Sequence, residues 1–176
     1  ARLRSHYCIL DERSSANAME HLGRVRNLES LRLEGQWVTD NALADLWRNH
    51  RLQLLRFNDA IVTDAGLPHI ARCRSIQSLS LSGTRITGEG LGQLKSCRRL
   101  VTLDLSGLTL ADAAFDQLAT LSSLRELNLV GTQATTEQLA KLADLNLTHL
   151  RLSGDPPYRG RNLQRFLDSL NRASGR

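Results

Sequence analysis

The residues that could do chemistry are few, and their spacing assembles neither a catalytic nor a metal site. The five histidines show no metal-ligand spacing with cysteines or carboxylates: His6, His21, His50, His69 and His149. A nucleophile motif of the form G-x-S-x-G does not occur. Gly88-Glu89-Gly90 marks a turn rather than a phosphate-binding loop, because no Gly-Lys-Ser/Thr follows it. The sequence therefore predicts a protein that is not an enzyme and that has no metal and no cofactor.

The three cysteines, Cys8, Cys73 and Cys97, do not make a disulfide framework. Cys73 and Cys97 lie one repeat apart, and in a stacked repeat their Cα atoms would be about 5 Å apart, within disulfide range. Their column is otherwise apolar except for Asn49, with Val25, Leu121 and Leu145 as its further members. We expect reduced, buried thiols that act as small hydrophobic side chains, with a Cys73–Cys97 disulfide as the alternative.

Arginines recur at the same interval and predict a basic edge along the molecule. Its members, which we call the arginine edge, are Arg24, Arg26, Arg48, Arg72, Arg74, Arg98 and Arg99, and Arg51 shares the column of Arg99. They fall where each predicted helix ends, whereas Asp40, Asp64 and Asp112 fall at helix starts. Favourable interaction with helix dipoles explains both sets of charges. The alternative is a docking edge for an acidic protein or a nucleic acid.

Nucleic acid is the less favoured of these anionic partners. Aromatic residues do not interleave with the arginines, so stacking platforms for bases are missing. The net charge of the chain is only +5. Trp37 and Trp47, close together near the N-terminal end, could instead form an interface with other sequence or pack within the domain.

An apolar repeat with a period of about 24 residues organises the chain and must position all of these residues. Ile76, Leu79 and Leu81 form its L-x-x-L-x-L core, and the alternation of the last two predicts a half-buried strand. A glycine such as Gly83 follows and indicates a tight turn. An apolar pair three residues apart then indicates one face of a short helix, so that each unit is strand, turn and helix. A single unit cannot bury its apolar edge, but stacked units can.

This pattern resembles the leucine-rich repeat family. The segments Cys73-x-x-Ile76-x-x-Leu79-x-Leu81 and Cys97-x-x-Leu100-x-x-Leu103-x-Leu105 are most similar to its cysteine-containing type, which also occurs in many bacterial proteins. The resemblance implies an α/β fold, a right-handed solenoid and horseshoe segment of about seven coils. A parallel sheet would line its concave face and short helices its convex face. One column departs from that class, which often has Cys or Asn after the strand; its members here are Gln36, Ala60, Thr84, Leu108, Thr132 and Pro156.

The repeat predicts one domain over residues 1–176. Residues 1–27 are expected to form a first coil without a clear cap, 28–154 regular repeats, and 155–176 a capping helix and tail, with the helix itself at 161–172. In the first coil, Tyr7 and Ile9 are expected to face the core, because they precede Leu31 and Leu33 by one full repeat.

No apolar run is long enough to predict membrane insertion. The absence of a signal peptide and of a disulfide framework favours a cytoplasmic location.

Strand residues that flank the buried leucines are expected to face outward on the concave sheet. The candidate partner-binding residues on this face are Ser30, Arg32, Glu34, Leu54, Arg56, Asn58, Ser80, Asp104, Asn128 and Arg151. In the first coil the same pattern places Cys8 and Leu10 outward. The face is polar and lacks a cluster of aromatic residues, so a solvated sheet without a ligand is the alternative.

The leading functional hypothesis is a non-enzymatic protein–protein interaction domain that binds a partner on its concave face. One alternative is an anionic partner, nucleic acid or acidic protein, along the arginine edge. Another is an assembly element that packs through its N-terminal end, against upstream sequence or a second copy.

Overall fold

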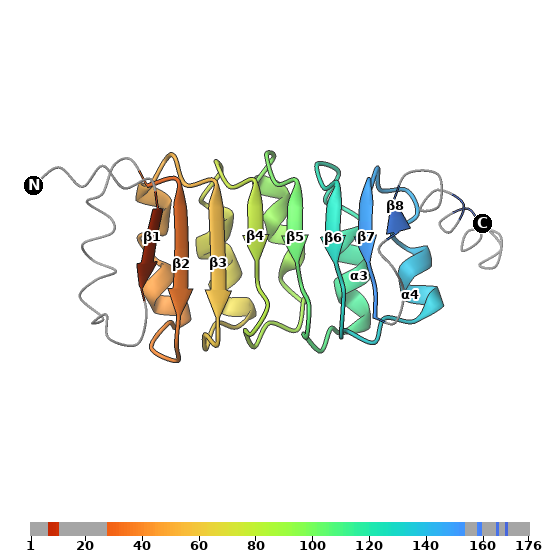
Figure 1. The fold of residues 1–176 in the computed structure, drawn as a ribbon, viewed down its shortest axis with the longest axis horizontal. Coiled ribbons are helices and arrows are strands. Elements are labelled where there is room, and N and C mark those ends of the chain that lie inside the picture. The colour runs from red at the N-terminus through yellow and green to blue at the C-terminus, as the bar shows by residue number, and fades with distance from the viewer. Residues whose placement is uncertain (1–6, 11–27, 154–157, 160–164, 166–167, 169–176) are drawn as a thin grey trace, which may run out of the picture.

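Strands pair into one sheet in the order in which they follow along the chain (Figure 1). The computed structural model describes residues 7–10, 28–153, 158–159, 165 and 168. Within these residues the first seven strands are parallel and the eighth is antiparallel to its neighbour. The strands are β1 (Tyr7–Leu10), β2 (Ser30–Glu34), β3 (Leu54–Asn58), β4 (Ser78–Ser80), β5 (Thr102–Asp104), β6 (Glu126–Asn128), β7 (His149–Arg151) and β8 (Tyr158–Arg159).

The register of the sheet follows the apolar repeat. Leu31 pairs with Leu55, Leu55 with Leu79, and Leu79 with Leu103, so that each step along the sheet is one full repeat of the chain. The step from Leu127 to Leu150 is shorter by a single residue. Coil number and handedness stay predictions.

The first strand corrects the sequence-based alignment. Tyr7 pairs with Ser30 and Ile9 with Arg32, so the step from β1 to β2 is shorter than the full repeat by a single residue. Side chains alternate between the two faces of a strand. This slip therefore moves each side chain of β1 to the face opposite the predicted one. Tyr7 and Ile9 are about half exposed (50% and 49%), whereas Cys8 and Leu10 are packed against the core.

Short helices form a second layer that covers one face of the sheet (Figure 1). Several are 3₁₀ helices, because each coil has room for only one or two turns before the chain returns to the sheet. The helices are η1 (Asp40–Leu43), η2 (Leu46–Arg48), η3 (Asp64–Gly66), α2 (Leu67–Ala71), η4 (Leu91–Ser96), α3 (Asp112–Leu118) and α4 (Thr136–Ala140).

The core lies between the two layers and consists mainly of leucine ladders. Leu31, Leu55, Leu79 and Leu103 are at most 1% exposed, and each packs above its equivalent in the preceding coil. Phe57 and Phe115 are the largest fully buried side chains of the described residues. Each leucine buried in this way contributes about 1.5–3 kcal/mol relative to an exposed one.

The turns after β2 to β6 have a left-handed backbone at the position of the glycine column. Gly83 and Gly107 have φ of 72° and 74°. Asp59, which interrupts the column, has a φ of 51° and so adopts the same turn at some conformational cost. In the column that departs from the cysteine-containing class, Thr84 and Thr132 donate their hydroxyls to carbonyls of Leu81 and Leu129. These bonds are local, within one turn of chain.

Aspartates at the helix starts bind the following coil rather than their own helix. Asp40 accepts hydrogen bonds from the amide and the hydroxyl of Thr63, at 2.8 and 2.7 Å. Asp64 accepts the same pair from Thr87, at 2.9 and 2.7 Å, and further bonds from the amides of Gly88 and Gly90. The predicted role of these carboxylates as partners of a helix dipole is therefore incomplete, because their bonds join successive coils.

The C-terminal end differs in one respect from the expected arrangement. β8 adds a short antiparallel strand beside β7, which the sequence did not indicate. The predicted capping helix at 161–172 lies outside the described residues except for Arg165 and Asp168, which are helical. Most of the predicted first coil, residues 1–27, also lies outside the described part of the chain.

We predict that Asp64→Asn lowers the free energy of unfolding by about 1–2 kcal/mol at neutral pH, because an amide side chain cannot satisfy four donors. Partial burial raises the pKa of Asp64, but the bonds from Thr87, Gly88 and Gly90 outweigh it and hold the pKa below its ordinary value. The contribution of Asp64 is therefore complete above the unfolded pKa of about 3.9 and is lost as pH falls through the lower folded pKa.

Urea unfolding followed by circular dichroism at neutral and acidic pH measures this difference. Asp144→Asn is the matched control, since Asp144 is exposed and its substitution removes the same charge. An equal effect of the two substitutions, or an Asp64 effect that persists unchanged at about pH 2, would contradict the proposed bonding.

Candidate functional site

The open side of the sheet, opposite the helices, displays the outward-facing residues of β1 to β7, and we call it the sheet face. Parallel register aligns them into rows, with Arg32, Arg56, Ser80 and Asp104 side by side on four successive strands. Alternation within each strand buries the leucines and leaves these residues partly or fully exposed. The row continues through Asn128 and Arg151. The structure thus brings the candidate residues of the strands onto one surface, and their role in binding stays a prediction.

Charge is distributed unevenly along the sheet face. Arg32 and Arg56 make its β2–β3 end basic, although Arg32 forms an ion pair with Glu34 at 3.3 Å. Asp104 and Glu126 make the following strands acidic. Neighbouring strands lie about 4.8 Å apart, so Arg56 and Asp104, two strands apart, are separated by about 10 Å across the sheet.

Two adjoining hollows occupy this surface. The first, of about 410 Å³, extends from Arg32 and Arg56 to Asp104, and Ser78 and Ser80 lie between them. Small serine side chains leave this space open between the longer charged ones. The second, of about 220 Å³, continues over β5 to β7, where Glu126, Asn128, His149 and Arg151 line it, and Thr102 and Asp104 border both hollows.

Ordered contacts fix the acidic part of this surface. The Thr102 hydroxyl donates to Glu126 at 3.2 Å, and His149 lies 3.8 Å from the same carboxylate. Asp104 accepts a hydrogen bond from the amide of Ser106 at 2.9 Å. These contacts hold the carboxylates at the surface of the sheet and restrict their motion.

Two functional candidates were missed by the sequence alignment. The slipped register places Tyr7 and Ile9 on the sheet face, beside Ser30 and Arg32, and removes Cys8 and Leu10 from it. The sheet face therefore has one aromatic side chain, Tyr7, at its N-terminal end. Cys8 and Leu10 are an apolar pair two residues apart, and this spacing is compatible with the observed register. Tyr7 and Ile9 have the same spacing and are also apolar, so the sequence alone did not distinguish the two registers.

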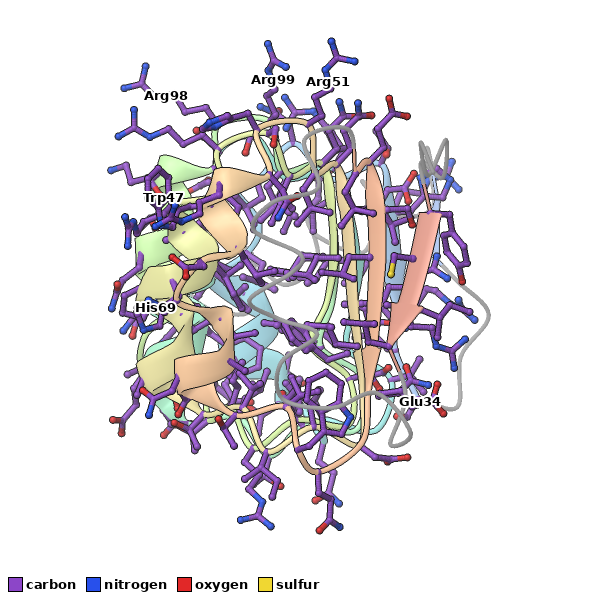
Figure 2. The ribbon with its side chains drawn as sticks, turned by 90° about the vertical axis from the view of Figure 1, so that its left-hand side faces the viewer. Glu34, Trp47, Arg51, His69, Arg98 and Arg99 are labelled. Carbon is purple, nitrogen blue, oxygen red and sulfur yellow. The ribbon has the colours of Figure 1, made fainter. Side chains whose placement is uncertain are left out.

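The arginine edge divides into two groups. Arg98 and Arg99, together with Arg51, project from the edge where the strands begin (Figure 2). They are exposed, and within the described residues they form no ion pair. Arg48 and Arg72 instead turn toward Trp47, with their guanidinium carbons 5.5 and 4.5 Å from its ring centroid. Arg24 and Arg26 lie outside the described part of the chain.

Trp37 and Trp47 both pack within the domain and are half-buried. Trp37 donates its indole N–H to the carbonyl of Glu34 at 2.8 Å. Trp47 lies on the helix side (Figure 2), with His50 edge-on to its ring at 6.4 Å. Both side chains are packed against the core, which agrees with packing within the domain, and an interface with other sequence stays a prediction.

Cys73 and Cys97 are buried free thiols, and Cys8 is a partly buried one. The Cys97 thiol lies 3.6 Å from the carbonyl oxygen of Cys73. Burial is the main cause that raises the pKa of Cys73, to about 12, and proximity to Cys97 raises it further against a smaller opposing effect of Arg72. Burial likewise raises the pKa of Cys97. Both side chains are therefore neutral small hydrophobes at physiological pH.

In the described residues, no group of three or more histidine, cysteine or carboxylate side chains has the arrangement of a metal site. A helix long and apolar enough to cross a membrane is likewise not found in the part of the chain that the structure describes.

Fold and sequence pattern together define the class of this protein. One strand, one left-handed turn and one short helix recur from coil to coil, and stacking turns the leucine positions into continuous ladders. The chain has the fold of a leucine-rich repeat solenoid.

No protein-family model matches the chain, and no curated protein matches it. Among solved structures it is similar to an internalin of Listeria monocytogenes, with 20% identity and a TM-score of 0.49, over 85% of this chain and 47% of that chain. It is also similar to the plant peptide hormone receptor RGFR1, solved in complex with RGF2, with 16% identity and a TM-score of 0.45, over 72% of this chain and 24% of that chain. The chain spans less than half the length of either protein, and these are likenesses of fold alone.

We predict that Cys73 and Cys97 resist alkylation by iodoacetamide in the folded protein at about pH 8, because thiols with raised pKa values supply almost no thiolate there. Both should react once the protein is unfolded in urea. Intact mass spectrometry under non-reducing conditions measures the result. A loss of two hydrogens from the native mass would show a disulfide and contradict the assignment.

Proposed function

We propose that this chain is a non-enzymatic interaction domain that binds a protein partner on the sheet face. The observation that carries the proposal is the unbroken row from Arg32 to Arg151, which the register of six strands aligns over two adjoining hollows. Leucine-rich repeat solenoids present extended surfaces of this kind for partner binding. A rigid sheet also lowers the entropy cost of binding, because its side chains are positioned beforehand.

The charges of the sheet face favour a partner segment of defined polarity. An acidic side chain of the partner would lie opposite Arg32 and Arg56, and a basic one opposite Asp104 and Glu126, about 10 Å further along. The serines between them admit a small or extended stretch of the partner, because Ser78 and Ser80 leave the hollow open. Tyr7 and Ile9 extend this surface with apolar area at its N-terminal end. Aromatic side chains in such positions often supply a large share of binding energy.

A second candidate is an anionic partner on the arginine edge. The exposed guanidiniums of Arg51, Arg98 and Arg99 favour it, since they project from one edge of the molecule (Figure 2). Binding there would weaken steeply with rising salt. Assembly through the N-terminal end is a third candidate, which the exposure of Ile9 on the first described strand favours.

We predict that a charge-swapped variant, Arg56→Asp with Asp104→Arg, loses the peptides that the wild-type domain selects. Peptides would be enriched from a random display library on the wild-type protein and measured by fluorescence anisotropy. We expect affinity to fall about tenfold or more, because each swapped site places like charges opposite each other. Enriched peptides should carry an acidic residue a few positions from a basic one.

Arg85→Glu is the matched control, since Arg85 is exposed in the loop after β4 and does not line either hollow. Circular dichroism would first establish that all variants fold. Equal affinity of the wild type and the charge-swapped variant would refute binding on the sheet face. If Arg98→Glu with Arg99→Glu alone abolished binding, the arginine edge would be the site instead. Concentration-dependent light scattering of the free domain would favour assembly.

A further inference from the structure

A separate groove opens on the helix side, between the coil that contains η2 and the coil that contains α2. Its volume is about 690 Å³, and its lining includes Trp47, Asn49, His50, Arg72, Arg74 and Gln93. We propose that this groove binds a phosphate monoester group. The site lies in the helix layer and shares no lining residue with the hollows of the sheet face.

The electrostatics of the groove favour a doubly charged anion. Arg72 and Arg74 are its two permanent cations, and no carboxylate is among the residues that line it. Both arginines are exposed and form no ion pair within the described residues. A phosphate monoester carries about −1.5 to −2 charge at neutral pH, which two guanidiniums match, whereas a carboxylate carries half as much.

Trp47 orients one of these guanidiniums. The guanidinium carbon of Arg72 lies over the indole ring, 4.5 Å from its centroid, in a cation–π contact. The N–H donors of a guanidinium lie in its plane, and stacking leaves their edges open for bidentate bonds to oxygens. Arg48, on the same ring, is bound to Asp45 at 2.9 Å and does not line the groove. Trp47 thus fixes the position of Arg72 without neutralising it.

Asn49 supplies an independent sign of a binding site. Its equivalents in the other coils are Cys73, Cys97, Leu121 and Leu145, all buried and apolar. Asn49 is only 1% exposed, yet its side-chain oxygen has no hydrogen-bond partner, and its amide makes one long bond of 3.4 Å to Leu46. A buried acceptor without a partner loses its hydrogen bonds to water and gains none in return, so Asn49 destabilises the fold at this position. A ligand that carries an N–H donor beside its phosphate would satisfy this oxygen.

These features together point to a phosphorylated side chain on a polypeptide, because its backbone amide lies a few bonds from the phosphate. Free phosphate shares the anionic chemistry but lacks the N–H donor. The two sources therefore differ in what they require of Asn49, and both require Arg72 and Arg74.

Binding would be tested with inorganic phosphate and with N-acetyl-phosphoserine amide, by isothermal titration calorimetry at constant ionic strength. Trp37→Phe leaves Trp47 as the sole tryptophan, so its fluorescence reports whether the ligand enters this groove. We expect a saturable change with both probes, tighter binding of the phosphoserine compound, and none with N-acetylserine amide. Arg72→Gln with Arg74→Gln should weaken the binding of both probes about tenfold or more.

Arg85→Gln with Lys95→Gln is the matched control for loss of two exposed cations, since both residues lie outside the groove and the arginine edge. Asn49→Leu should raise the melting temperature of the protein. It should also weaken binding of the phosphoserine compound about threefold or more, with little effect on binding of inorganic phosphate. A purely structural Asn49 would change stability alone. Arg74→Gln, at an exposed position, serves if the double variant does not fold.

The proposal fails if Trp47 fluorescence does not respond to either probe. It fails equally if the control pair weakens binding as much as Arg72→Gln with Arg74→Gln, or if succinate binds as tightly as phosphate. If binding of the phosphoserine compound depends on Asn49, the groove is assigned to phosphorylated polypeptide. If inorganic phosphate binds equally well and its binding does not depend on Asn49, the groove is assigned to the free anion. The peptide-binding test of the sheet face uses different residues, so either site can fail without the other.

Discussion

The constraint on which the whole structure depends is that one coil cannot bury its own leucines. A coil has room for a short strand and a helix of one or two turns, and its apolar edges stay open until neighbours cover them. Parallel pairing in constant register solves this, because each leucine then stacks on its equivalent in the next coil. The same register aligns the outward-facing side chains into rows. The sheet face and its hollows are therefore direct results of how the core is buried.

Much of the fold could be predicted from the sequence, because apolar residues recur at a nearly constant interval of about 24 residues. Leu31, Leu55, Leu79 and Leu103 mark the pairing of four strands, and the glycine column marks the turns that need positive φ. The sequence failed at β1, where Tyr7, Cys8, Ile9 and Leu10 are all compatible with burial. With no polar residue to mark the outer face, only pairing with β2 distinguishes the two registers.

The contacts that shape the candidate sites were out of reach for a different reason. Asp64 and Thr87, like Trp47 and Arg72, belong to different coils, and nothing in either segment alone indicates the partner. The arginine columns could be recognised in the sequence, and they predicted a single basic edge. In the structure Arg72 lies over an indole ring, whereas Arg98 and Arg99 project from the edge of the sheet. Asn49 was visible as an exception in an apolar column, and only the structure shows that its oxygen lacks a partner.

Side chains tie successive coils together along the helix layer. Asp40 and Asp64 bind Thr63 and Thr87 of the following coil. Gln117 bonds to Glu89 and Gly92 of the preceding coil, and Lys141 bonds to Asp116. If the molecule is stretched along its axis, the coil interfaces carry the load in series. Each interface that has such a tie then resists extension through side-chain bonds as well as through the packing of leucines.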